Sequence, residues 1–492
     1  MAIIDEIRQA RIKKLEELKK QGINPYPAKV KKDYLISEVL INFLKLEKAK
    51  KKITLTGRIR LLRPHGKICF FHFSDASGKI QGLMAQDDLG EEKYKLFLDN
   101  FDIGDFIEIK GSLFKTKTKE KTIRASDFRI IAKSLRPLPE KWHGLQDVEE
   151  RFRKRYLDIL MNSDIKEVFI KRAKILRLIR EYLDENGFLE VETPVLQPIY
   201  GGASARPFLT HLKALDMNLY LRISSELYLK RLIAGGFDKV YEVGKNFRNE
   251  GIDRQHNPEF TAIEFYWAYA DYNDLMKFTE KMLTSVIKQV CSSLQIEFEG
   301  TKLNFKAPWL RISYREMLLK HVKIDIDKVK TEEELKKAIS EKKLGLDFKG
   351  AVGYGPLLDA LYKEYCRPKI VQPCFLIDHP TELMPLAKRK ENDPAKIESF
   401  QLLIAGYEIL KAYSELNDPE DQRKRWLEQE GLAKKGLEEH EVLDEDYLET
   451  LEYGLPPTAG WGLGLDRLTA ILTNQHSLRD VILFPLMKPK DN

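Results

Sequence analysis

The sequence has little of the cysteine that a disulfide framework or a structural zinc site requires. Its four cysteines, Cys69, Cys291, Cys366 and Cys374, show no paired C-x-x-C spacing, which points away from both features. Cys366, Cys374 and His379 lie close together in the chain, but their spacing matches no common zinc motif. We therefore expect neither disulfides nor zinc to organise this fold.

Long apolar runs are also missing. No stretch is long and apolar enough to span a bilayer, and the first residues lack the apolar segment of a signal peptide. We therefore expect a cytoplasmic protein with no membrane partner. Hydrophobic residues make up 43% and charged residues 32% of the 492 positions, which is typical of globular chains, and the length predicts more than one domain. The net charge of +7 permits a polyanionic partner without requiring one.

The first part of the chain predicts a basic helical extension over residues 1–50 and a small β-barrel over residues 51–134. Residues 2–21 fit a helix that stops at Gly22, and its lysines and arginines form either a solvated face or a surface that follows phosphates. Five short β-like runs follow, with a helix-compatible stretch at 91–100 before the fourth run. This pattern predicts an OB-type barrel.

Such barrels bind single-stranded nucleic acid by stacking bases on aromatic side chains. Phe70 and Phe71 follow a strand rich in arginine, and strand alternation lets only one of the two rings face outward. The alternative is that one ring of this adjacent pair is simply a core residue. Gln81 is a candidate for reading a base edge. Residues 135–160 predict a linker that begins with a proline-rich segment and continues into a charged helix over 148–159.

The most informative stretch is 247–266, which contains F-R-N-E, a polar loop and H-N-P-E-F-T-A-I-E-F-Y. It predicts two strands joined by a loop, with Arg248 and Glu250 on one face of the first strand. The second strand presents four residues on a common face, namely Phe260, Ala262, Glu264 and Tyr266. A guanidinium pairs with phosphate or carboxylate, and a ring offers a stacking surface. From these residues alone, a hairpin with a surface ion pair and core aromatics remains the alternative.

Residues 400–417 predict a second hairpin that turns at Gly406-Tyr407. Gln401 and Glu408 then share one face, and a bulge after Glu408 turns the following residues toward them. Those residues are Lys411, Tyr413 and Glu415.

Two shorter signals accompany the hairpins. Glu226 opens a predicted helix, where it serves either as a cap or as a partner for a ligand ammonium. The glycine-rich G-W-G-L-G-L-D-R-L places Arg467 near a helix N-terminus, where its guanidinium can meet a phosphate. The segment at about 271–390 reads as a helical insertion with no assigned chemistry.

Taken together, N-G-F-L-E-V-E-T-P, F-R-N-E…H-N-P-E-F and G-W-G-L-G-L-D-R resemble the three signature motifs of class II aminoacyl-tRNA synthetases. Y-G-G-A-S-A-R-P-F, S-S-E-L-Y-L-K-R and S-E-L-N-D-P-E-D-Q narrow the resemblance to the class II lysyl-tRNA synthetases. The resemblance covers nearly the whole chain. It implies an α+β protein in which the OB-type barrel precedes a catalytic domain, residues 161–492, with an antiparallel sheet flanked by helices.

The resemblance also implies a reaction and its participants. The family ligates L-lysine to the 3′ end of its tRNA through a lysyl-adenylate, uses ATP and Mg²⁺, and releases AMP and pyrophosphate. The stretch N-G-F-L-E-V-E-T-P would lie at a homodimer interface.

Site residues follow from the same resemblance. Arg248 and Arg467 would be catalytic, and the anticodon would be read by Phe70 and Gln81. The ATP site would consist of Arg248, Glu250, His256, Asn257, Phe260, Glu408 and Arg467. The lysine site would consist of Gly202, Glu226, Arg248, Glu250, Tyr266, Tyr413, Glu415 and Gly462. Metal ligands would be Glu408 and Glu415.

Two positions depart from the family pattern. The family usually has glutamate, a metal ligand, where this chain has Gln401, and asparagine where it has Lys411. The paired change suggests that the Lys411 ammonium substitutes in part for one Mg²⁺; the alternative is independent drift with Lys411 pointing outward. Because the resemblance places position 411 in the lysine site, the same changes also affect the expected specificity for lysine. Two other functions fit the sequence less well: a related class II ligase with another acceptor, and a non-catalytic RNA-binding protein on the same scaffold.

Overall fold

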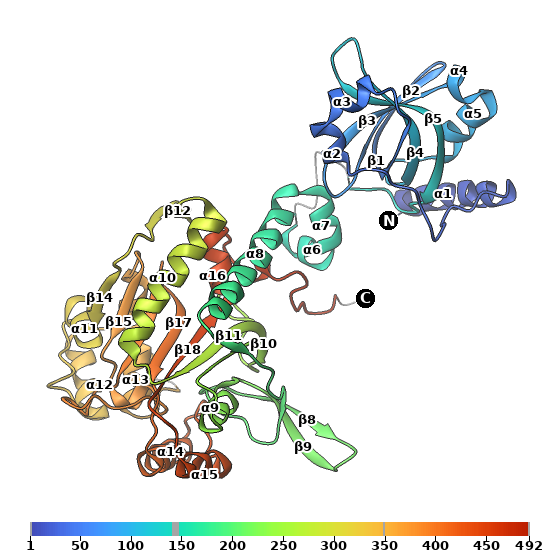
Figure 1. Ribbon diagram of the computed structural model, residues 1–492. Helices are drawn as coiled ribbons and strands as arrows, with labels where there is room; N and C mark the ends of the chain where they lie inside the picture. Colours follow the sequence, from blue (N-terminus) through green and yellow to red (C-terminus); the bar gives the residue numbers. More distant parts are fainter. Residues whose placement is uncertain (1, 140–146, 348–349, 491–492) are drawn as a thin grey trace. The chain divides into compact units, whose positions relative to one another are not determined.

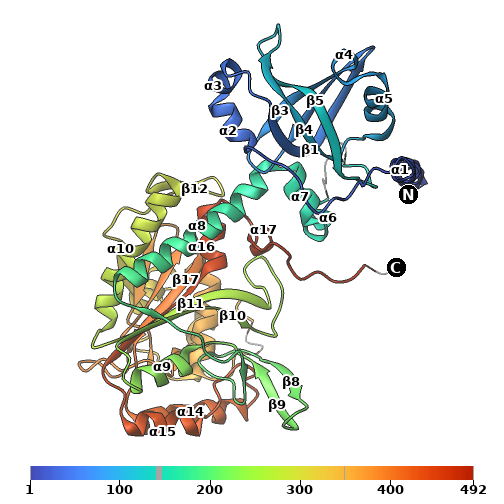
Figure 2. The same ribbon diagram turned by 45° about the vertical axis from the view of Figure 1, so that its right-hand side comes forward.

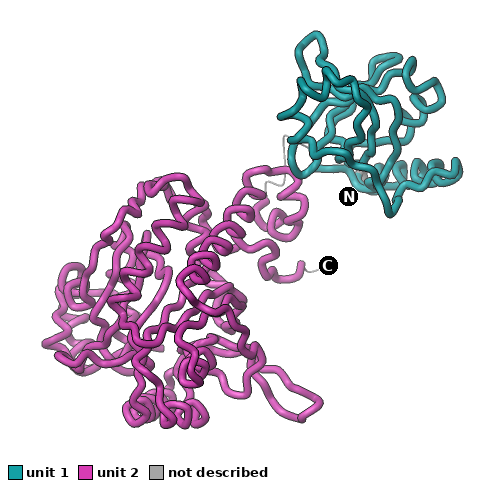
Figure 3. The backbone as a smooth tube through the Cα atoms, viewed as in Figure 1, with its two compact units in different colours: residues 1–146 teal, residues 147–492 magenta. Residues whose placement is uncertain are grey.

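We describe a computed structural model of the chain over residues 2–139, 147–347 and 350–490 (Figure 1). The chain forms two compact units, residues 1–146 and 147–492 (Figure 3). Part of the predicted linker, residues 140–146, lies outside the described residues. Residues 148–161 form two short helices of unit 2, where the sequence predicts a single helix over 148–159.

Unit 1 is a closed five-stranded barrel with strand order β1-β2-β3-β5-β4, as the sequence predicts. Its apolar interior includes Phe71, Phe73 and Phe97, and the helices that precede the barrel add Leu18 and Phe43 to the same core. The elements are α1 (Ala2–Lys20), α2 (Ile36–Ile41), α3 (Phe43–Lys48), β1 (Ile53–His65), β2 (Ile68–Ser74), β3 (Lys79–Ala85), α4 (Gln86–Leu89), α5 (Glu91–Asn100), β4 (Phe106–Lys115) and β5 (Lys121–Ala132).

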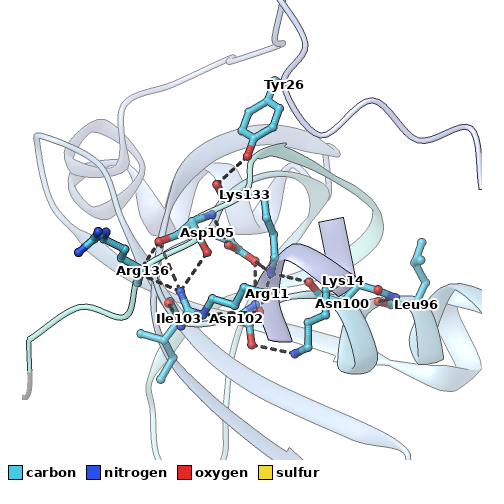
Figure 4. A network of polar contacts seen from close by, with 11 residues as sticks. Arg11, Lys14, Tyr26, Leu96, Asn100, Asp102, Ile103, Asp105, Lys133 and Arg136 are labelled. Carbon is cyan, nitrogen blue, oxygen red and sulfur yellow. Dashed lines mark hydrogen bonds and ion pairs between the residues drawn. The ribbon is translucent and has the colours of Figure 1, made fainter. Parts of the chain in front are cut away.

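A polar network fixes α1 to the barrel (Figure 4). The buried ammonium of Lys133 donates to the carboxylate of Asp105 at 2.7 Å. Arg11 of α1 donates to the carbonyl oxygens of Ile103 at 3.0 Å and Ser134 at 3.1 Å. Since a buried charge is costly unless it is paired, this network holds α1 in a defined place. The basic extension is therefore packed on the barrel along at least this helix.

Unit 2 is built on an eight-stranded sheet with order β14-β15-β16-β17-β18-β11-β10-β6. The strands from β15 to β10 in this order are antiparallel, and a parallel pair lies at each edge. The sheet strands are β6 (Leu189–Glu190), β10 (Lys239–Phe247), β11 (Glu259–Ala268), β14 (Leu310–Ser313), β15 (Cys374–Ile377), β16 (Ser399–Ile404), β17 (Tyr407–Ser414) and β18 (Thr458–Gly464).

Helices and smaller sheets surround this sheet (Figures 1 and 2). The helices are α6 (Val148–Arg153), α7 (Arg155–Met161), α8 (Ser163–Glu185), α9 (Glu226–Ala234), α10 (Tyr272–Cys291), α11 (Tyr314–His321), α12 (Glu332–Glu341), α13 (Tyr354–Leu361), α14 (Pro419–Ala433), α15 (Glu445–Tyr453), α16 (Leu465–Leu472) and α17 (Leu478–Val481), with short helical turns η1 (Tyr362–Cys366), η2 (Arg367–Lys369) and η3 (Thr381–Leu383). The smaller sheets contain β7 (Leu196–Gln197), β8 (Phe208–Leu212) and β9 (Met217–Leu221), and β12 (Gln295–Phe298) with β13 (Thr301–Asn304). In the described part of the chain, no helix has the length and apolar character needed to cross a membrane.

Strand alternation gives the central sheet one apolar and one polar face. Phe265 and Trp461, on neighbouring strands, stack with ring centroids 4.8 Å apart in the main core, which α8, α10 and α16 cover. The indole N–H of Trp461 donates to Thr279 of α10 at 3.0 Å. Residues one position away in each strand point to the opposite face. That second face carries the polar side chains described below.

The prediction of a helical insertion at about 271–390 is wrong in part. This segment contains α10, which packs on the central sheet, and it supplies two strands of that sheet, β14 and β15. The helices α11, α12 and α13 form a separate apolar cluster against the same edge. Helical periodicity hides strands of four residues, because so short a run gives no clear alternation.

Candidate active site

The pairing register places the predicted polar residues of three strands on one face of the sheet. Lys411 lies opposite Gln401 on one side and Gly462 on the other, and Gly462 lies opposite Glu264. Directly paired residues of an antiparallel sheet point to the same face. A second row contains Tyr413, Gly460 and Tyr266.

The hairpin of β16 and β17 differs from the prediction by one residue at its turn. The central turn residues are Ala405 and Gly406, with φ of 51° and 77°, as a two-residue hairpin turn requires. The predicted bulge is present, because Leu402 pairs with Leu410 and Leu403 with Glu408. The bulge brings the two predicted groups together.

Arg248 lies just beyond β10, and its amide donates to the carbonyl of Pro258 at 2.8 Å. Its guanidinium carbon is 5.1 Å from the centre of the Phe260 ring, which pairs a charge with an aromatic face. Within the described residues its buried Nε has no hydrogen-bond partner. Glu250 does not share a strand face with Arg248, because β10 ends at Phe247 and Glu250 lies in the loop.

Arg467, in the first turn of α16, faces the same region. Its Nη1 donates to the carbonyl of Glu408 at 2.9 Å. Burial lowers the pKa of Arg467; among nearby charges Glu408 raises it, whereas Arg367 and Arg248 lower it. Two guanidinium groups from distant segments therefore lie close enough to repel each other, an arrangement that a bound polyanion would stabilise.

Three carboxylates gather beside this region, and we call Glu226, Glu264 and Glu415 the acidic cluster. The cluster already binds an ammonium, that of Lys230, which is fully buried. Lys230 Nζ lies 2.5 Å from Glu226 Oε1 and also pairs with Glu415. Burial would lower the pKa of Lys230, but Glu226 and Glu415 raise it well above its usual value. Burial raises the pKa of Glu415 well above its usual range, although Lys230 opposes the shift.

Glu264 is a site residue that sequence reasoning placed on the correct face but left out of the predicted site. It accepts hydrogen bonds from Ser224 Oγ at 3.1 Å and Asn246 Nδ2 at 3.1 Å. Burial and the nearby Glu226 raise its pKa. Lys230 was missed altogether, because a glutamate and a lysine four residues apart on a helix usually form a surface pair.

Tyrosine rings enclose the buried ammonium. Lys230 Nζ lies 6.0 Å from the ring centre of Tyr266, 5.6 Å from Tyr413 and 5.9 Å from Tyr447. The hydroxyl of Tyr413 donates to Glu226 at 2.6 Å. Cation–π contact and carboxylate pairing together form an environment selective for an ammonium group. Tyr447, from α15, carried no sequence signal.

Comparison with known proteins supplies the family. Residues 147–488 match the family described as tRNA synthetases class II (D, K and N), and residues 53–131 match the family described as OB-fold nucleic acid binding domain. The chain belongs to the class II tRNA synthetases.

Full-length relatives narrow the similarity within the class II synthetases. A lysine–tRNA ligase of Carboxydothermus hydrogenoformans is 49% identical over 488 residues, which cover 99% of each chain. One from Pelotomaculum thermopropionicum is 48% identical and covers 99% of this chain and 96% of its own. One from Clostridium tetani is 46% identical over 99% of this chain and 97% of its own.

At two glycine positions of the motifs, neighbouring side chains lie so close that a Cβ atom would not fit. Gly460 lies directly against the acidic cluster, since a Cβ at this position would overlap Glu415 and lie 2.5 Å from the Tyr266 ring. Gly202 has φ of 80°, and a Cβ there would lie 2.9 Å from Glu226. Gly462 is less constrained, with Glu264 at 3.6 Å from the corresponding position. Gly202 and Gly462 were predicted; Gly460 was not.

Two predicted ATP-site residues lie in the loop between β10 and β11. His256 Nδ1 is 2.8 Å from Asp253 Oδ2, and Asn257 Nδ2 donates to the carbonyl of Glu259 at 2.6 Å. These contacts fix the loop, and they leave His256 exposed.

Phe70 and Gln81 belong to unit 1. Phe71 is fully buried whereas Phe70 is half-buried, which agrees with the expectation that only one ring faces out. His72 pairs with Gln81 in the register, so Phe70 and Gln81 lie on the same outward face. Gln81 accepts a hydrogen bond from Thr122 at 2.8 Å.

The two predicted metal ligands contact different groups. Glu408 accepts a hydrogen bond from Gln401 Nε2 at 2.9 Å, whereas Glu415 pairs with Lys230 in the acidic cluster. Over the described residues, no three His, Cys, Asp or Glu side chains are arranged so that they could hold a metal ion. A Mg²⁺ ion shared by Glu408 and Glu415 does not fit this arrangement.

Proposed function

We propose that this protein ligates L-lysine to the 3′ end of its tRNA in two steps, first forming lysyl-adenylate from lysine and ATP. The observation that carries the proposal is the acidic cluster. It holds the ammonium of Lys230 between buried carboxylates and tyrosine rings, and Arg467 donates to the backbone of β17, the strand that leads to Glu415. The full-length relatives named lysine–tRNA ligase support the same substrate.

Lysine specificity follows from the chemistry of the cluster. A substrate ammonium gains charge-assisted hydrogen bonds worth roughly 1.5–3 kcal/mol each. An uncharged isostere gains none of these bonds and therefore binds more weakly. We assign the ammonium to Glu226, Tyr266 and Glu415, and the α-amino group to Glu264.

The adenylation step needs no protein nucleophile. A lysine carboxylate oxygen attacks the α-phosphorus of ATP, the bond to the bridging oxygen breaks, and pyrophosphate leaves. Arg248 holds the α-phosphate and the attacking carboxylate, Arg467 holds the γ-phosphate, and Phe260 stacks on adenine. Positioning and electrostatic stabilisation supply the rate enhancement. In the second step a hydroxyl of the terminal ribose attacks the lysyl carbonyl carbon, and AMP leaves.

The remaining partners are assigned as follows. The barrel binds the anticodon through Phe70 and Gln81, since an outward ring beside a polar amide suits an unstacked base. The exposed apolar side chains of Leu189, Val195 and Leu196, with fractional exposures of 50%, 40% and 46%, support a homodimer interface. Because tRNA charging takes place where translation occurs, we assign the enzyme to the cytoplasm.

ATP–pyrophosphate exchange, measured with each amino acid in turn, tests the proposal. We expect lysine alone to stimulate exchange, and Arg248→Ala to abolish it while tRNA binding persists. Arg177→Ala, on the exposed side of α8, is the matched control and should behave as wild type. Phe70→Ala should weaken tRNA charging and spare exchange. Stimulation by a different amino acid would identify a related ligase, and tRNA binding without any exchange would identify a non-catalytic protein.

A further inference from the structure

Glu408 lies on the polar face of the sheet among cationic side chains. Lys411 lies opposite Gln401 in the strand register, and Gln401 Nε2 donates to Glu408 Oε2 at 2.9 Å. On the other side, Arg467 donates to the Glu408 carbonyl at 2.9 Å. The bulge at Ile409 is the feature that turns Glu408 and Lys411 toward the same region.

The charge around Glu408 is strongly positive. Burial alone would raise the pKa of Glu408, yet neighbouring cations lower it below its usual value. These cations, which we call the cationic cluster, are Lys411, Arg467, Lys363 and Arg367. Lys363 also pairs with Asp359 at 2.6 Å. The three other cations still outnumber the single carboxylate of Glu408, and this excess positive charge suits a polyanion such as a triphosphate.

Lys411 lies on the polar face of the sheet, opposite Gln401 on one side and Gly462 on the other. It is half-buried, and its charge acts on the half-buried Glu408 and the buried His379. Burial and, to a smaller extent, the charge of Lys411 together lower the pKa of His379 to about 3. The imidazole therefore stays neutral and adds no charge to the cluster.

Gln401 brings no charge of its own. Its Nε2 donor is directed at Glu408, and its Oε1 lies 3.5 Å from the hydroxyl of Tyr362. Relative to a pair of carboxylates at 401 and 408, this arrangement lacks one negative charge and carries an additional positive one on Lys411. A divalent cation held between residues 401 and 408 would lose one anionic ligand and face a nearby ammonium.

We propose that the Lys411 ammonium supplies, at the phosphates of the bound nucleotide, positive charge that a divalent cation held by two carboxylates would otherwise bring. The protein then binds ATP with fewer metal ions at this position, and nucleotide binding survives metal removal. The proposal rests on the proposed function insofar as it takes ATP as the nucleotide.

Binding of a non-hydrolysable ATP analogue in the presence of EDTA, measured by calorimetry, tests the role of Lys411. We expect Lys411→Asn to weaken this metal-free binding about ten- to a hundredfold, as loss of a charge-assisted hydrogen bond implies. Lys411→Arg should retain most of the affinity, because it keeps the charge. Lys281→Asn, an exposed position on α10, makes the same chemical change away from the site and should have no effect. Equal metal-free affinity of Lys411→Asn and wild type would overturn the proposal.

Counting bound Mn²⁺ by electron paramagnetic resonance gives a second readout that does not depend on activity. The double variant Gln401→Glu/Lys411→Asn should bind more Mn²⁺ per bound analogue than wild type, because a second carboxylate replaces the ammonium. Equal Mn²⁺ numbers in both proteins would contradict the inference. Lysine-dependent ATP–pyrophosphate exchange by the wild-type protein tests the proposed function on its own. If exchange is absent, the proposed function is refuted, and the binding measurements still decide the role of Lys411.

Discussion

Replacing Lys230 with methionine removes an ammonium that is fully buried between Glu226 and Glu415. Methionine keeps much of the aliphatic volume, so the change is mainly one of charge. Removing one member of a buried ion pair costs about 3–5 kcal/mol, because the remaining charge is left buried without compensation. Since two carboxylates share this ammonium, we expect the free energy of unfolding to fall by an amount within that range.

Denaturant unfolding followed by tryptophan fluorescence measures this loss. Unit 2 holds four of the five tryptophans, so the signal reports mainly on the unit that contains Lys230. Lys281→Met, on the exposed side of α10, is the matched control and should stay within about 0.5 kcal/mol of wild type. A loss below about 1 kcal/mol in Lys230→Met would refute the reasoning, since it would mean that the pair is not desolvated.

Two additions separate charge from packing. Glu415→Gln combined with Lys230→Met should recover part of the lost stability, because a neutral amide needs no counter-ion. Free lysine should stabilise Lys230→Met, by about 2.7 kcal/mol at a concentration 100 times its dissociation constant. Norleucine, which keeps the α-amino group but lacks the side-chain ammonium, should not. Equal stabilisation by both amino acids would show that the cluster recognises shape and not charge.

Two further changes probe the surroundings of the site. Burial raises the pKa of Glu441 to about 7 from 4.5, so the folded state keeps a proton that the unfolded state releases. The stabilisation from this group is therefore fully present below pH 4.5, and it falls by about 3 kcal/mol as the pH rises to 7. In Glu441→Gln the side chain still accepts a hydrogen bond from the Trp426 indole but no longer titrates. Unfolding measured as a function of pH should therefore lose this decline in the variant. Gly460→Ala places a Cβ against Glu415 and should cost about 1–3 kcal/mol and raise the KM for lysine in exchange assays. The control is Gly431→Ala in α14, where the added Cβ meets open space, and it should be neutral or stabilising. If both variants change stability and the KM for lysine equally, Gly460 is not in close contact with the acidic cluster.

The sequence alone determined the features that depend on local periodicity. Alternation along 259–268 assigned Glu264 and Tyr266 to the face on which the structure has them, and the same rule separated Phe70 from the buried Phe71. These inferences succeed because side-chain direction in a strand is set by the backbone within a few residues.

Only the tertiary structure decided which charges are buried together. Glu226 and Lys230 are one helical turn apart, a spacing that sequence reasoning assigns to solvent, yet both are buried because Glu415 and Tyr447 converge on them from distant segments. The strands β14 and β15 were hidden for a related reason, since a four-residue strand is identified by its partner and not by its own pattern. The cost of burying a charge depends on the complete set of neighbours, and that set is fixed only when the chain has folded.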